Sequence, residues 1–140
     1  MDTISLKMPV TIKAKLTEKL KTKMLKELTE GINRAELEIQ QIGIQEKRVM
    51  QENTPADPTP QDIQRLNAIR QHFEQERQKR ADYCEQAKAR KEETEKLVLG
   101  AEIVQGTLER QVEVHVGDDM RELMNVEVLV EDDKIIAIRG

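Results

Sequence analysis

A proline-rich segment near the middle of the chain constrains the fold more than any other feature. Residues 54–60 have the sequence Thr-Pro-Ala-Asp-Pro-Thr-Pro, and three prolines in six positions cannot continue a helix. The stretches on either side, 16–53 and 61–97, contain 38 and 37 residues with helical spacing. Two helices of nearly equal length, each about 55 Å long, joined by a short turn predict an antiparallel hairpin.

Capping signals mark the starts of both predicted helices. Thr59 can cap the second helix, Pro60 is its first helical residue, and Asp62 lies where a capping box needs a carboxylate. Thr17 is a candidate cap for the first helix. We therefore place the turn between the helices at residues 54–60.

The two helices present unequal seams to each other. Seven of eight seam positions in the first helix are apolar: Leu25, Leu28, Ile32, Ala35, Ile39, Ile42, Glu46 and Val49. The second helix has only five apolar residues in ten: Leu66, Arg70, Phe73, Arg77, Arg80, Cys84, Ala87, Lys91, Thr94 and Val98. Five further apolar residues widen the stripe on the first helix: Leu20, Met24, Leu37, Ile44 and Met50.

Small residues in the helices predict where the two helices come close. Gly31 and Gly43 interrupt the first helix, and each indicates either a flexible point or a close helix approach. Cys84 lies on the seam of the second helix, where a small apolar side chain packs between helices.

Both ends of the chain have the two-residue period of β-strands. Apolar and polar side chains alternate through residues 1–14, although Pro9 cannot donate to a ladder and indicates an edge position or a bulge. Four further apolar runs lie in residues 98–140, which makes five candidate strands. A turn at 117–119 and an Asp-rich hairpin connection at 131–134 separate these runs.

These patterns together predict an α+β fold. An antiparallel hairpin brings residues 15 and 98 together, so the N-terminal strand can join the C-terminal strands. We expect a small, mostly antiparallel β domain of residues 1–14 and 98–140, with a coiled-coil-like helical arm at 15–97. The strands would form either a half-open barrel or a compact sheet.

Four segments near the chain ends carry a recognisable pattern: VTIKAKLTE at 10–18, LGAEIVQG at 99–106, VEVHVGD at 112–118 and DKIIAIR at 133–139. They resemble the YlqD-like family of small bacterial proteins, and the resemblance spans nearly the whole chain. It implies a bacterial, cytoplasmic protein. Because the matching motifs are structural, the resemblance transfers no catalytic residue.

Several functional classes are unsupported by the composition. No apolar run approaches the ~20 residues of a membrane span, and no signal peptide opens the chain, so we expect a cytoplasmic protein with no membrane partner. One cysteine excludes an internal disulfide, and two histidines make an internal zinc site implausible. The glycine spacing matches no phosphate loop. We therefore expect no cofactor, no metal and no small-molecule substrate.

Catalytic groups are equally hard to assemble. His72 and His115 have no partner at a recognisable spacing, and no nucleophile, base and orienting group combine. We expect that the protein is not an enzyme.

An acidic cluster near the C-terminus has two interpretations. Its members are Asp118, Asp119, Glu122, Glu131, Asp132 and Asp133. Carboxylates at loop tips can bind Ca²⁺ or Mg²⁺, but EF-hand spacing is absent, and solvated turns are the interpretation we favour.

A lysine-rich stretch at the start of the first helix also has two interpretations. It contains Lys13, Lys15, Lys19, Lys21, Lys23 and Lys26, opposed only by Glu18. We favour a solvated helix face. The alternative is an RNA- or ribosome-associated factor that contacts phosphates through Lys15, Lys19, Lys21, Lys23 and Lys26.

The widened apolar stripe of the first helix supports a different function. Apolar surface beyond what one partner helix buries is typical of an interface. We therefore expect a non-enzymatic protein-interaction or assembly module, an adaptor or a holdase-like protein, that binds a protein partner or self-associates. The structural alternative is that the long stems of Arg and Lys cover the stripe.

Overall fold

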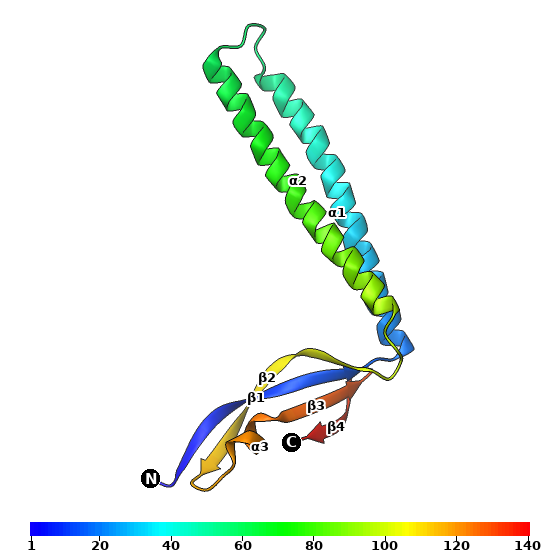
Figure 1. Cartoon of the computed structure of the whole chain (residues 1–140), viewed down its shortest axis with the longest axis vertical. Helices are drawn as coiled ribbons and strands as arrows, with labels where there is room; N and C mark the ends of the chain where they lie inside the picture. Colours follow the sequence, from blue (N-terminus) through cyan, green and yellow to red (C-terminus); the bar gives the residue numbers. More distant parts are fainter. The chain divides into compact units, whose positions relative to one another are not determined.

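The computed structural model describes residues 1–140, which form two compact units: residues 1–23 with 97–140, and residues 24–96. In chain order its elements are β1 (Thr3–Lys15), α1 (Glu18–Asn53), α2 (Pro60–Glu95), β2 (Glu102–His115), α3 (Met120–Met124), β3 (Val126–Glu131) and β4 (Lys134–Arg139). The predicted α+β fold is confirmed: a long antiparallel helical hairpin accompanies a mostly antiparallel sheet built from both chain ends (Figure 1).

The first strand lies inside the sheet rather than at its edge. The strand order is β2-β1-β3-β4, with β1 antiparallel to β2 and parallel to β3, while β3 and β4 form an antiparallel hairpin. Lys15 pairs with Glu102, so the residues that flank the helical hairpin are direct neighbours in the sheet. The predicted tight connection after β3 is confirmed, because Asp132 and Asp133 both have positive φ, as in a two-residue hairpin turn.

The structure refines the predicted sheet in three details. The sheet is open and has four strands, because β2 continues through Gly106 while it remains paired to β1. Of the two alternatives for Pro9, the edge position is confirmed, because β1 pairs with β3 only from Val10 onward; the register shift lies between Ile12 and Lys13. The short helix α3 was not predicted, although Asp119 caps it by accepting a hydrogen bond from the Arg121 backbone N–H.

An ion-pair network crosses the polar face of the sheet and takes one residue from each strand. Lys13 Nζ on β1 lies 2.8 Å from Glu127 Oε1 on β3. On β4, the Arg139 guanidinium donates to both carboxylate oxygens of Glu102 on β2, at 2.7 and 2.9 Å, and lies 3.8 Å from Glu127 Oε2. Hydrogen bonding from Arg139 lowers the pKa of the Glu102 carboxyl below its usual value.

The opposite face of the sheet is apolar. Met8 and Val10 of β1 and Val126 of β3 are buried there. The helix that contacts this part of β1 is α3, which has only five residues. This short helix covers only part of the apolar face, whereas an apolar sheet face normally packs against a complete second layer.

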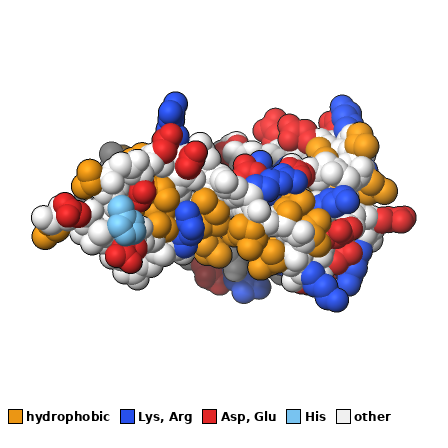
Figure 2. Space-filling model, turned by 90° about the horizontal axis from the view of Figure 1, so that it is seen from below, with side chains coloured by type: hydrophobic (Ala, Val, Ile, Leu, Met, Phe, Trp, Pro, Cys, Tyr) orange, Lys and Arg blue, Asp and Glu red, His pale blue; other side chains and the backbone are white.

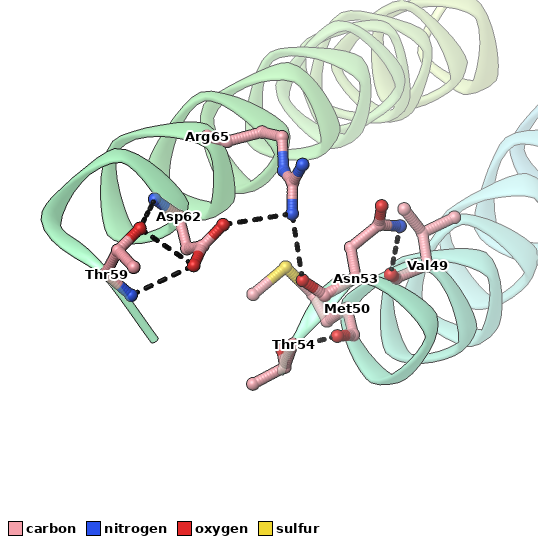
Figure 3. A network of polar contacts seen from close by, with 7 residues as sticks. All are labelled: Val49, Met50, Asn53, Thr54, Thr59, Asp62 and Arg65. Atoms are coloured by element: carbon pink, nitrogen blue, oxygen red, sulfur yellow. Dashed lines mark hydrogen bonds and ion pairs between the residues drawn. The ribbon is translucent and has the colours of Figure 1, made fainter. Parts of the chain in front are cut away.

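The turn of the hairpin is fixed by a polar network (Figure 3). The predicted capping box is confirmed: the Asp62 backbone N–H donates to the Thr59 hydroxyl oxygen, and the Thr59 backbone N–H donates to the Asp62 carboxylate. Arg65 Nη2 donates to the Asn53 carbonyl and so places a positive charge at the C-terminal end of α1. These bonds connect the end of one helix to the start of the next.

Charged residues in the seam of α2 are matched by carboxylates of α1. Arg77 forms a hydrogen-bonded ion pair with Glu46, the one polar member of the α1 seam, and Arg80 donates to Glu38. The hydrogen bonds that Arg77 donates to Glu46 and Glu74 raise the pKa of its guanidinium above the usual value. Two members of the predicted seam are wrong: Arg70 is exposed while Ile69 is half-buried, and Val98 is exposed and follows the end of α2.

Small residues mark the closest contacts within the hairpin. Gly31 is buried, and the Tyr83 hydroxyl occupies the space that a Cβ at that position would need, which confirms a close approach there. Gly43 has open space around its Cα, so no close approach occurs at that position. Cys84 is buried, as predicted, with its Sγ 3.9 Å from the Ile32 carbonyl oxygen.

The capping box predicts a measurable stability loss. Thr59→Ala removes the hydroxyl that accepts from the Asp62 backbone N–H, and we expect the free energy of unfolding to fall by about 1 kcal/mol. Thr54→Ala is the matched control, because that hydroxyl only donates to the Met50 carbonyl at the end of α1. Urea unfolding followed by circular dichroism measures both variants. Equal losses would contradict the capping role.

The ion-pair network predicts a pH dependence. The folded pKa of Glu102 is lowered, so its stabilising contribution exists at neutral pH and is lost as the pH falls through that lowered pKa. We expect Glu102→Gln to lower the thermal midpoint at neutral pH and to match the unmodified chain at about pH 2. Glu109→Gln, on the same strand, is the control. A Glu102→Gln deficit that persists unchanged in acid would contradict this interpretation.

Candidate protein-interaction surface

Two aliphatic side chains form an exposed ridge on the outer side of α1. Leu37 and Ile44 are one heptad apart, about 10 Å along the helix, and their exposed fractions are 54% and 62%. The seam residues Ile32, Ala35 and Ile42 are buried on the opposite side of the same helix. The ridge residues Leu37 and Ile44 therefore contribute little to the packing of α1 against α2.

The neighbours of this ridge three and four positions along α1 are basic or neutral, and the adjacent Glu36 and Glu38 pair with Lys88 and Arg80 of α2. The exposed residues three or four positions from Leu37 or Ile44 include no carboxylate: Asn33, Arg34, Gln40, Gln41, Lys47 and Arg48. Arg34, Lys47 and Arg48 form no ion pair within the chain, unlike Arg77 and Arg80 in the seam. An apolar centre with cations around it is complementary to an apolar surface with acidic flanks.

The other three residues of the predicted stripe are less accessible. Leu20, Met24 and Met50 are half-buried. The structure therefore does not expose the five predicted interface residues together. It exposes Leu37 and Ile44, so the candidate surface is narrower than the stripe deduced from the heptad pattern.

Some side chains of the lysine-rich stretch have partners within the chain, and others are exposed to solvent. Lys13 pairs with Glu127, and Lys21 Nζ donates to the Leu97 carbonyl at 2.9 Å. Lys15 is half-buried. The exposed lysines are Lys19, Lys23 and Lys26, which follow one another at spacings of four and three and so lie on one side of α1.

Three carboxylates of the acidic cluster act in turns and caps. Asp118 accepts a hydrogen bond from the His115 backbone N–H, Asp119 caps α3, and Asp132 accepts one from the Thr17 hydroxyl. Thr17 also accepts from the Leu20 backbone N–H, which confirms the predicted cap of α1.

The expectation that His115 is isolated is wrong. Its Nδ1 lies 3.6 Å from Asp118 Oδ2 and its Nε2 lies 3.8 Å from Glu113 Oε1. All three side chains are exposed to solvent. The three side chains therefore form a solvent-exposed polar cluster.

Sequence reasoning missed the exposed apolar side chains of the sheet. Ile4, Leu108, Ile135 and Ile138 are each more than half exposed. The arrangement of the predicted elements could have revealed them. The alternating strands predicted a sheet with one apolar face, and besides the strands and the helical hairpin the sequence predicted no further apolar segment to pack on that face.

Comparisons with known proteins complete these observations. A family model described as YlqD protein matches residues 4–139. A crystal structure of a protein of unknown function from Synechococcus sp. WH 8102 has a TM-score of 0.83 and 24% sequence identity, and the match covers 99% of this chain and 95% of that chain. The comparison with curated proteins gives no match. None of the helices combines the length and the apolar character needed to cross a bilayer.

Proposed function

Taking as premise that the chain belongs to the YlqD protein family, we propose that it is a non-enzymatic adaptor or holdase-like module. Its helical hairpin binds another protein through the ridge of Leu37 and Ile44. The observation that carries the proposal is the exposure of these two side chains on the side of α1 that faces away from the closed seam. Apolar side chains that packing does not require are typical of binding surfaces.

The chemistry of the ridge describes the partner. Two apolar anchors about 10 Å apart match the spacing of anchors at i and i+7 on an amphipathic helix. The cations Arg34, Lys47 and Arg48 around the ridge favour acidic residues at the margins of that helix. The partner is therefore a protein with an acidic, amphipathic helix.

Replacement of the two anchors should separate binding from folding. We expect Leu37→Ser/Ile44→Ser to reduce partner capture from bacterial lysate by about tenfold or more, because central apolar anchors dominate interface energy. Gln40→Ser/Gln41→Ser carries the same substitution between the anchors on the same face and should capture normally. Both variants should have equal helicity by circular dichroism. An identical set of captured proteins for both variants would contradict the proposal.

RNA or ribosome association is the second candidate function, favoured by the exposed lysines at 19, 23 and 26. Three phosphate contacts to single-stranded RNA predict that log K falls with log salt concentration with a slope of about −2. Replacement of all three lysines by Gln should abolish a gel shift with single-stranded RNA at low salt, whereas Lys47→Gln should not. A wild-type chain that gives no shift would eliminate this alternative.

A further inference from the structure

The apolar face of the sheet has a composition unlike that of any other surface of the protein. The residues of β1 on this face, from Ile4 to Ala14 in steps of two, have apolar register partners on β2 and β3 at most positions: Val114, Val112, Leu108, Val126 and Val128. Val128 in turn pairs with Ile138 on β4. Register partners point to the same face of a sheet. Figure 2 shows hydrophobic side chains gathered in a band on the unit that contains the sheet, residues 1–23 with 97–140.

The protein buries only the middle of this face. Leu123 of α3 is half-buried, and the residues buried near it are Met8, Val10 and Val126. On the same face the edge residues Ile4, Leu108, Ile135 and Ile138 have exposed fractions between 53% and 73%. An apolar sheet face normally packs against a complete second layer, and a five-residue helix is too short to form one.

The size of the face matches a stable interface. Strands of 13, 14, 6 and 6 residues, at about 3.3 Å per residue and about 4.8 Å between strands, have a flat footprint of about 600 Å², including the middle that α3 covers. Side chains that protrude from the sheet add to this area. Stable protein–protein interfaces bury about 800 Å² per partner, so two such faces are large enough to hold each other.

Charge on this face is balanced, as a contact between identical surfaces requires. Arg110 on β2 and Glu122 on α3 line the same hollow beside Leu123, and neither forms an ion pair or hydrogen bond within the chain. In an interface with two-fold symmetry, if one residue of the first copy contacts a different residue of the second copy, the same contact also occurs with the two copies exchanged. Two copies can therefore pair each Arg110 with the Glu122 of the other copy.

We infer that the apolar face of the sheet, with α3 on it, packs against the same face of a second copy, so that two chains form a dimer. The occupant of the face is another molecule of this protein. This inference does not rest on the binding function proposed for the α1 ridge, because it uses a different surface and a different partner.

The mass of the full chain in solution tests the inference. We expect sedimentation at micromolar concentration to give about twice the 16.2 kDa of one chain. Leu108→Glu should raise the dissociation constant of the dimer by about 30-fold or more. Val104→Glu is the matched control, because it lies on β2 with a similar exposed fraction but on the polar face, and it should remain dimeric.

Exchanging the charges of Arg110 and Glu122 distinguishes loss of the dimer from loss of folding. Arg110→Glu should weaken the dimer, and Arg110→Glu/Glu122→Arg should restore it with unchanged helicity. A monomeric wild-type chain, or equal effects of Leu108→Glu and Val104→Glu, would overturn the inference. Loss of the dimer in Leu37→Ser/Ile44→Ser, with Leu108→Glu still dimeric, would move self-association to the hairpin. A normal dimer that captures no partner would refute only the binding function.

Discussion

The pairing of β1 with strands from the other end of the chain is the interaction on which the structure depends. β1 lies inside the sheet, so β3 and β4 have no backbone pairing that connects them to β2 without it. Because Lys15 pairs with Glu102, the chain between them, which includes both helices of the hairpin, must end close to where it begins. Closing so long a loop carries an entropic penalty. A stiff hairpin with a capped turn reduces that penalty, because the two helices already hold the strand ends together.

The helical hairpin has some charged side chains in its seam and some aliphatic side chains on its outer side, which is the reverse of the usual amphipathic pattern. The seam contains Arg77 and Arg80, whereas the outer side of α1 carries Leu37 and Ile44. Glu46 and Glu38 of α1 form ion pairs with these two arginines. Such ion pairs specify which residues of the two helices meet, and they add little stability. The outer aliphatic side chains have no equivalent explanation in the fold. This contrast makes the ridge of Leu37 and Ile44 a candidate for function.

Features with local causes could be predicted from the sequence. The proline-rich turn, the capping box at Thr59 and the Asp-rich hairpin at Asp132 each depend on residues within a few positions of one another. Features decided by distant neighbours could not. β2 continues through Gly106 because β1 supplies a partner there, and Ile69 replaces Arg70 in the seam because of how α1 packs.

The candidate interaction surface was predicted only in part for the same reason. The heptad pattern identified the apolar residues of α1 that lie off the main seam, but not which of them the fold would expose. Leu37 and Ile44 are exposed and Met24 is half-buried, which no local pattern distinguishes. The accessible sheet face follows from a topology that places four strands in one layer with only α3 to pack on them.

The distance between Thr11 and Thr107 tests this account most directly. These residues are partners in the β1–β2 register, where Cα atoms lie about 5 Å apart. Spin labels at the two positions, in a Cys84→Ala background, should give a narrow distribution of short distances by electron paramagnetic resonance. A broad distribution, or a separation of several tens of ångströms, would show that the chain ends do not share one sheet and would contradict the account.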